Sequence, residues 1–171
     1  MRINSDSANK LVKQITSARS ALVAQERQVT TYSFLQGEEP FKPDYDFAGT
    51  QAKLDKMNEA IVILKHAINQ FNISAKLPGM DITVDMALVK LPILTAKAEK
   101  LERMAAVLEK TRSTNMAAKA AEYTCRNYDG SEAAAACKAA RAELVSIQQA
   151  LNTVNMTEFF EVDDTVNEAL A

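Results

Sequence analysis

The sequence has few of the residues that break helices and few of those that build catalytic centres. Its 171 residues include four glycines, four prolines, two cysteines, one histidine and no tryptophan. Because turn-forming residues are scarce and helix-forming residues are abundant, we expect long helices. Any serine–histidine or cysteine–histidine pair would have to use His66, and no hydrolase glycine motif accompanies a nucleophile. A single histidine also excludes a di-iron bundle, which needs two Glu-x-x-His motifs.

An excess of charge of one sign is also lacking. The net charge is −2, so there is no basic field to attract a nucleic acid, and we expect no such partner. The densest apolar run, residues 60–64, is far too short to cross a bilayer. Residues 1–10 are polar and do not have the pattern of a signal peptide. These features predict a cytoplasmic protein without membrane insertion.

The composition is that of a folded protein. Apolar residues make up 47% of the chain and charged residues 25%, so apolar burial can offset the entropy cost of ordering. We predict a single helical domain over residues 1–171. Residues 36–46 contain a glycine and two prolines and are expected to connect two helices. The acidic tail, residues 158–171, carries no helical stripe and is expected to be partly disordered.

Four segments carry apolar residues at alternating steps of three and four, which keeps one helix face turned toward a partner. The first spans about residues 7–33. Its stripe holds one polar residue, Gln25. We interpret Gln25 either as a hydrogen-bonded polar layer or as a residue that fixes the register of the helix pairing. The second follows an N-cap at Asp44 or Asp46 and ends near residues 72–76. The two stripes are Leu11, Ile15, Ala18, Leu22, Gln25, Val29 and Tyr32, then Phe47, Thr50, Leu54, Met57, Ile61, Leu64, Ile68 and Phe71.

The third and fourth segments are separated by a stretch of different character. Thr83 is the predicted N-cap of the third helix, and Pro92 within it predicts a kink. Glu122–Tyr128 alternates apolar and polar side chains, as a short strand does. Asp129 followed by a glutamate three residues later is a capping box that opens the fourth helix. The two stripes are Ala87, Leu91, Leu94, Ala98, Leu101, Ala105 and Leu108, then Cys137, Ala140, Leu144, Ile147, Leu151 and Val154.

Stripes of this length predict a mainly α-helical fold. We expect long antiparallel helical hairpins or a four-helix, coiled-coil-like bundle. A helix of about 25 residues is about 37 Å long, and one slender chain leaves part of such a stripe uncovered. The sequence therefore predicts a homo-oligomer.

The two cysteines, Cys125 and Cys137, are expected to be free thiols, with a disulfide as the alternative. Cys137 lies on the fourth stripe and is expected to be buried. We assign neither residue to a metal site, because two cysteines without further ligands do not make one.

Two acidic pairs are the pattern closest to a metal site. Glu99 with Glu102 and Glu161 with Asp164 are similar to the pairs that hold magnesium in helical nucleotide pyrophosphatases. They lie far apart in the sequence, so solvated charge is the expected role. No phosphate-binding glycine motif is present, and we assign no catalytic, cofactor-binding or metal-binding residue.

Three stretches, in order, resemble the septicolysin-like family of small bacterial helical proteins. The first is Gln36-Gly37-Glu38-Glu39-Pro40, after the first long helix. The second joins Ile68-Asn69-Gln70-Phe71-Asn72 to Gly79-Met80-Asp81-Ile82-Thr83. The third is Asn155-Met156-Thr157-Glu158, near the end of the last helix. The resemblance implies a helical, oligomeric protein with an extended segment near Glu122–Tyr128.

These observations lead to one main functional hypothesis. We expect a non-enzymatic, self-associating helical protein that acts as an interaction or scaffold module. The family's name implies an alternative, a membrane-active, lysin-like protein. The acidic pairs suggest a second alternative, a magnesium-dependent nucleotide hydrolase.

Overall fold

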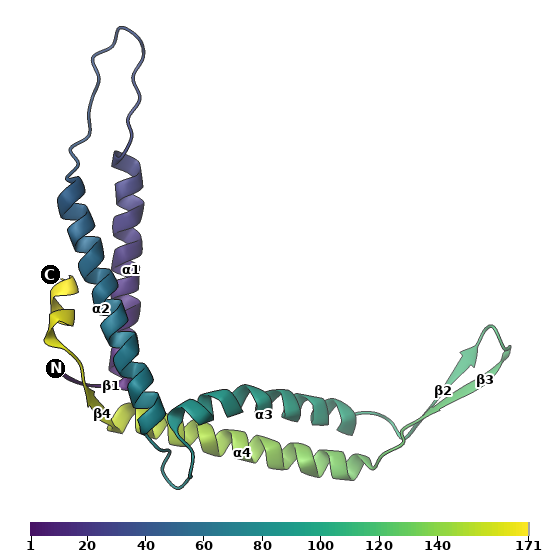
Figure 1. The fold of residues 1–171 in the computed structure, drawn as a ribbon. Coiled ribbons are helices and arrows are strands. Elements are labelled where there is room, and N and C mark those ends of the chain that lie inside the picture. The colour runs from purple at the N-terminus through teal and green to yellow at the C-terminus, as the bar shows by residue number, and fades with distance from the viewer. Residues whose placement is uncertain (171) are drawn as a thin grey trace. The chain divides into compact units, whose positions relative to one another are not determined.

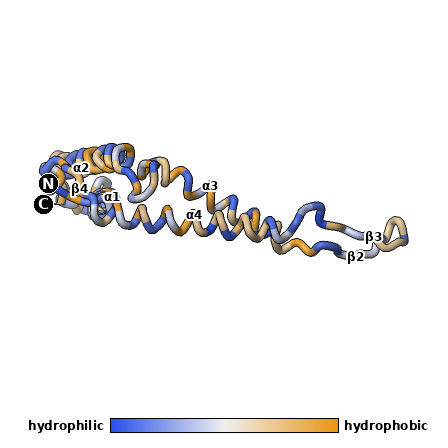
Figure 2. Tube along the Cα trace, turned by 90° about the horizontal axis from the view of Figure 1, so that it is seen from below, coloured by the Kyte–Doolittle hydropathy of each residue, from blue (hydrophilic) through white to orange (hydrophobic). Residues whose placement is uncertain are grey.

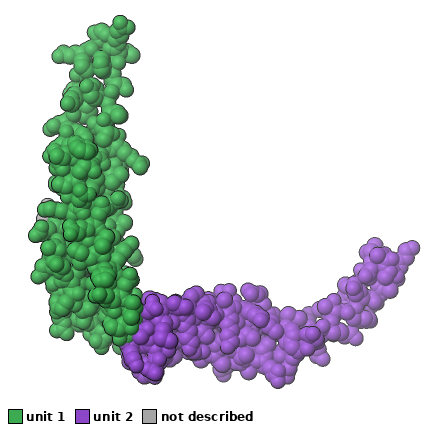
Figure 3. Space-filling view, viewed as in Figure 1, with its two compact units in different colours: residues 1–75, 153–171 green, residues 76–152 purple. Residues whose placement is uncertain are grey.

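The computed structural model describes residues 1–170 and is mostly helical, with 65% helix and small antiparallel sheets. The chain divides into two compact units, shown in different colours in Figure 3. Unit 1 comprises residues 1–75 together with the described residues from 153 onward, and unit 2 comprises residues 76–152. That these two units belong to a single domain stays a prediction.

Unit 1 is built on two long helices that lie side by side, α1 (Ser5–Val29) and α2 (Phe47–Ser74), as Figure 1 shows. Asp46, one of the two predicted caps, begins α2, and its side chain accepts a hydrogen bond from the backbone of Gly49 at 3.0 Å. Ile15 and Leu64 are fully buried, because their stripes face the interior of the unit. The core of unit 1 consists of Ala8, Ile15, Ala60, Leu64, Ile68, Val162, Val166 and Ala169.

The outer ends of the first two stripes do not take part in this core. Tyr32 lies beyond the end of α1 and is 45% exposed, and Phe47, the first residue of α2, is 66% exposed. Gln25 is also exposed, so it forms no buried polar layer. Its neighbour Glu26 is partly buried, and its carboxylate accepts hydrogen bonds from Tyr45 and Gln51. The periodicity identified the right turn of α1 but the wrong polar residue.

The acidic tail is more ordered than its composition suggested. Strand β4 (Phe159–Glu161) pairs antiparallel with β1 (Arg2–Asn4), with Ile3 opposite Phe160. A 3-10 helix, η1 (Asp164–Leu170), follows and packs against α2. Apolar side chains within the tail explain this order, because Val162, Val166 and Ala169 are buried in the core of unit 1. The acidic residues between them stay at the surface and obscure that spacing.

Unit 2 contains α3 (Val84–Ala105) and most of α4 (Gly130–Thr157). Two ion pairs join these helices, from Lys90 to Glu143 at 2.5 Å and from Arg141 to Glu102 at 2.6 Å. Apolar side chains from both helices are also buried. They include Leu94 and Ala98 of α3 with Cys137, Ala140 and Ile147 of α4.

The capping residues predicted from the sequence lie at the beginnings of both helices of unit 2. The Thr83 side chain caps α3 by accepting a hydrogen bond from the backbone of Met86 at 3.2 Å. Asp129 accepts from the backbone of Ser131 at 2.7 Å, just before α4 begins. Hydrogen bonds from the Ser131 side chain and backbone hold the pKa of Asp129 below its ordinary value. The third stripe ends earlier than predicted, because α3 stops at Ala105 and Leu108 is 68% exposed.

A β-hairpin joins α3 to α4. Strand β2 (Lys110–Asn115) pairs antiparallel with β3 (Ala120–Cys125), and Figure 1 shows both at the far end of the two helices. The alternation near residues 122–128 indicated a strand that the structure places at 120–125, so the prediction holds for residues 122–125 and not for 126–128. Its partner β2 was not predicted, because its sequence, KTRSTN, is polar on both faces.

Candidate interaction surfaces

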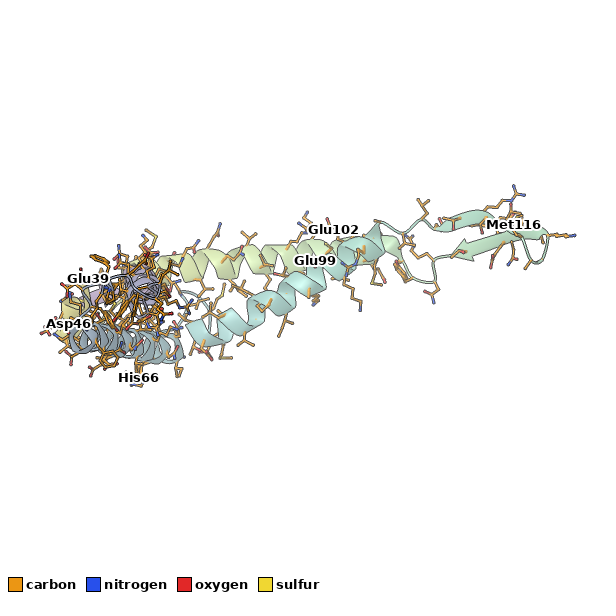
Figure 4. All side chains as sticks on the ribbon, turned by 90° about the horizontal axis from the view of Figure 1, so that it is seen from above. Glu39, Asp46, His66, Glu99, Glu102 and Met116 are labelled. Carbon is orange, nitrogen blue, oxygen red and sulfur yellow. The ribbon has the colours of Figure 1, made fainter. Side chains whose placement is uncertain are left out.

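Within residues 1–170, the side chains considered for catalysis or metal binding do not form a group that could hold a metal ion. His66 lies exposed on α2, and Figure 4 labels it together with Glu99 and Glu102 of α3. Glu102 forms the ion pair with Arg141 described above. Glu99 is exposed. Neither carboxylate converges on a third ligand in the described part of the chain.

The second acidic pair belongs to unit 1, whereas Glu99 and Glu102 belong to unit 2. Asp164 forms an ion pair with the N-terminal ammonium group of Met1 at 2.6 Å, and Glu161 lies in β4. Among residues 1–170, no group of three or more histidine, cysteine, aspartate or glutamate side chains is placed to hold a metal ion. The two acidic pairs therefore lie in different units, and one carboxylate of each, Glu102 and Asp164, forms an ion pair.

Both cysteines are free thiols. Cys137 is 8% exposed, and its Sγ atom lies 3.5 Å from the carbonyl oxygen of Ala98 across the α3–α4 pair. Cys125 is exposed at the end of β3. This difference in burial is the one that the fourth stripe predicted.

Helix α3 carries a second apolar face that no other part of its unit covers. Met86, Val89 and Ile93 follow one another at helical spacing and are 54%, 60% and 63% exposed. At 100° per residue, their mean direction is about 130° from that of the buried residues Leu94 and Ala98, so they form a separate face of the helix. A shallow hollow of about 310 Å³ runs along this face, and Figure 2 shows apolar residues along α3. A helix that is apolar on two sides is typical of one that is buried on both.

This face was not predicted, although its pattern is visible in the sequence. Residues 86, 89 and 93 repeat at steps of three and four, as the core stripe does, but in a different phase. The core stripe continues along the whole segment, whereas the second face is confined to the first half of α3. We name Met86, Val89 and Ile93 the apolar face of α3.

The connector between α1 and α2 displays aromatic side chains. Residues 30–46 form no helix or strand, and a connection of this length without regular structure is often functional. The rings of Tyr32 and Phe34 stack with their centroids 6.3 Å apart. Phe34 is 55% exposed, Leu35 70% and Phe41 86%. These side chains form a candidate contact surface for another apolar body.

The β2–β3 hairpin has two chemically different faces. Because side chains alternate along each strand, the pairing of Lys110 with Cys125 and of Arg112 with Tyr123 puts these four on one face. The ammonium group of Lys110 lies 4.3 Å from the centroid of the Tyr123 ring. We name Lys110, Arg112 and Tyr123 the cationic face. Figure 4 shows Met116 at the tip of the same hairpin, where it is 83% exposed.

The opposite face of the hairpin is neutral to acidic and satisfies its own polar groups. The Asn115 side-chain amide donates a hydrogen bond to Glu122 at 3.2 Å, and the Thr111 hydroxyl donates to the carbonyl oxygen of Thr124 at 3.4 Å. No ion pair forms at Arg112 within the described residues. The cationic face is therefore the face that is open to a partner.

A groove of about 420 Å³ lies within unit 1, between α2 and β4. The rings of Phe71 and Phe160 pack together at its base, with their centroids 4.9 Å apart. Glu158 and Glu161 line it, and neither carboxylate has an ion-pair partner among residues 1–170. We name this the acidic groove. Its lining residues are Ala67, Gln70, Phe71, Ser74, Ala75 and Glu158–Glu161.

No family model, curated protein or solved structure matches this chain. Within residues 1–170, no helix has both the length and the apolar character needed to cross a bilayer. Four surfaces of the described chain are candidates for contact with a partner: the apolar face of α3, the aromatic connector, the cationic face and the acidic groove.

Proposed function

We propose that the chain is a non-enzymatic, self-associating helical protein that acts as an interaction or scaffold module. The observation that carries this proposal is the apolar face of α3. Three large apolar side chains at helical spacing, each more than half exposed, are costly to leave in water. A second copy of the chain is the partner whose apolar surface is always available at matching concentration.

The proposed assembly also gives a role to the stripes. We propose that α1–α2 and α3–α4 are antiparallel hairpins with coiled-coil-like packing. If two copies meet through the apolar face of α3, their α3–α4 pairs form a four-helix arrangement with two-fold symmetry. Val89 of each copy would then lie near the symmetry axis, where an isologous contact repeats the same residues.

Light scattering on surface variants tests this proposal. Val89→Asp and Ile93→Asp each place a carboxylate in the proposed contact and should lower the molar mass of the assembly toward that of one chain. Thr95→Asp is the matched control, because it adds the same charge to an exposed position of α3 outside the apolar face. Equal masses for all three variants and the wild type would reject this face as the contact.

The aromatic connector favours a second candidate function, contact with a membrane surface. The connector exposes Phe34, Leu35 and Phe41. Aromatic side chains partition well into the bilayer interface. The resemblance to the septicolysin-like family points in the same direction. Dye release from lipid vesicles tests it, with Phe41→Ser as the matched variant. Release that requires Phe41 would support a lysin-like protein over a scaffold.

We also propose that the protein works in the cytoplasm. Cys125 is an exposed free thiol and Cys137 a buried one. Unpaired cysteines suit a reducing compartment, where glutathione and thioredoxin keep thiols reduced. Fractionation of cells that produce the protein, followed by thiol labelling, would test both the compartment and the redox state.

A further inference from the structure

We propose that the cationic face of the β2–β3 hairpin docks in the acidic groove of a second copy of the chain. This inference rests on the proposed self-association and adds a second contact to the one through α3. It names both sides of that contact, Lys110, Arg112 and Tyr123 on one copy and the groove beside Glu158 and Glu161 on the other.

The hairpin is an element that needs a partner. It consists of two strands only, and every residue of β2 and β3 is exposed except Asn115, which is partly covered. A lone two-stranded ribbon is at best marginally stable in water. Since the face with Glu122 satisfies its own polar groups, the cationic face is the one that gains from a contact. Tyr123 is 53% exposed, and tyrosine is one of the residue types enriched among the anchors of protein interfaces.

The acidic groove has the complementary chemistry. Glu158 and Glu161 supply two carboxylates without ion-pair partners in the described structure, opposite in charge to Lys110 and Arg112. Phe159, at the same edge, is 49% exposed, with the guanidinium group of Arg2 5.4 Å from the centroid of its ring. The segment from 158 to 170 contains five acidic residues and no basic one. Arg2 is the basic residue opposite Glu161 in the β1–β4 pair, and the acidic excess that remains attracts a cationic ribbon.

A second copy fits this face better than a nucleic acid does. The chain as a whole carries a net charge of −2, which opposes the approach of a polyanion. The cationic face has only two basic residues on its strands, too few for the phosphate contacts that give firm binding to a duplex. In contrast, every copy of the chain carries an acidic groove, whose charge is opposite to that of the cationic face.

The contact has a consequence for symmetry. The hairpin and the groove are different surfaces, so the contact is heterologous. It is made twice when two copies exchange hairpins around a two-fold axis, and otherwise it closes a ring or extends a filament. In either case each copy uses both its surfaces, and loss of either one weakens the same assembly.

Charge reversal and its rescue test the proposal in the full-length protein. Arg112→Glu alone and Glu161→Arg alone should each weaken self-association about tenfold or more, measured by sedimentation at several concentrations, because like charges then meet. The variant with both substitutions should restore the association. Glu122→Arg is the matched control on the other hairpin face and should leave the assembly unchanged. Circular dichroism verifies that each variant keeps the wild-type helix content.

Cys125 provides a second readout, because it shares the face of Lys110 and Tyr123. Its labelling by a thiol reagent should slow as the wild-type concentration rises and the hairpin becomes covered. In Glu161→Arg the labelling should stay fast at concentrations that protect the wild type. Cys137, buried in the helix pair, should label slowly throughout.

The outcomes separate this inference from the proposed function. A monomeric wild type overturns both. An associating wild type that is unaffected by Arg112→Glu, or a double variant that shows no rescue, overturns the hairpin contact and leaves self-association through α3 standing. If Arg112→Glu changes only the binding of an added DNA or RNA oligonucleotide, the cationic face belongs to a nucleic acid and the proposed contact is wrong.

Discussion

The hydroxyl group of Tyr45 donates a hydrogen bond to the carboxylate of Glu26, and thereby ties the end of the connector to the last turns of α1. The side-chain amide of Gln51 donates to the same oxygen at 2.6 Å. One carboxylate thus holds the connector and the first turns of α2 against α1. These hydrogen bonds join α1 and α2 at the connector end of the pair, where the apolar stripes no longer bury large side chains.

The Tyr45–Glu26 contact predicts a pH dependence. The hydrogen bond to Glu26, with burial and the negative charge of Glu26, raises the pKa of Tyr45 above its ordinary value of 10.0. A raised pKa in the folded state means that the contribution to stability is complete below pH 10 and is lost as the pH rises beyond it. Tyr45→Phe should therefore melt at a lower temperature than the wild type at pH 8. The difference should shrink above pH 10, and a constant difference across this range would contradict the assignment.

Leu64 and Lys65 are neighbours in sequence and differ in burial, since Leu64 is fully buried and Lys65 is exposed. Leu64→Asp should lose about 2–5 kcal/mol of core packing. It should also pay the cost of placing a carboxyl group in an apolar site. Total stability is usually about 5–15 kcal/mol, so this variant should be largely unfolded. Lys65→Asp should remain within about 0.5 kcal/mol of the wild type. Thermal melts with equal losses at both positions would refute the placement of α2.

Asn4 links three elements of unit 1. Its side-chain oxygen caps α1 by accepting a hydrogen bond from the backbone of Ser7 at 2.9 Å, and its amide donates to the carbonyl oxygen of Met156 at 3.0 Å. Asn4→Ala should cost about 1 kcal/mol for the lost cap and about 1 kcal/mol for the second hydrogen bond. Asn4→Asp keeps the cap and loses the amide donor, so urea denaturation should place it between the other two. If Asn4→Asp is as unstable as Asn4→Ala, the cap contributes nothing.

The two thiols should differ in reactivity. Cys137 is 8% exposed between α3 and α4, where apolar burial disfavours the thiolate that reacts, whereas Cys125 is exposed. In dilute solution, before association covers the hairpin, Cys125 should label at least about tenfold faster than Cys137. Denaturation should remove the difference. Rapid labelling of both in the folded protein would contradict the register of α4.

The elements with long stripes could be predicted from the sequence, because burial along a helix leaves a repeating pattern. Leu64, Ile15 and Cys137 are buried as their stripes require. Caps were equally readable, because Asp46 and Thr83 act through the backbone groups next to them in sequence. Such local signals do not depend on which segments meet in the folded chain.

The features that depend on distant partners could not be predicted. Strand β4 forms because β1, at the other end of the chain, pairs with it, and three-residue strands leave no pattern of their own. The acidic tail is ordered by the burial of Val162 and Val166. This series of apolar residues is too short to be recognised as a helical stripe. The apolar face of α3 was hidden because its residues repeat in a second phase beside a longer stripe. The surfaces proposed here for function therefore emerged from exposure in the structure.

The molar mass of the intact chain at sedimentation equilibrium tests the central claim most directly. One chain has a mass of 18.8 kDa. Self-association predicts a whole-number multiple of that mass at micromolar concentration, and a shift toward 18.8 kDa in Val89→Asp. A wild type that stays at 18.8 kDa over the whole concentration range would contradict the claim that this protein acts by assembling with itself.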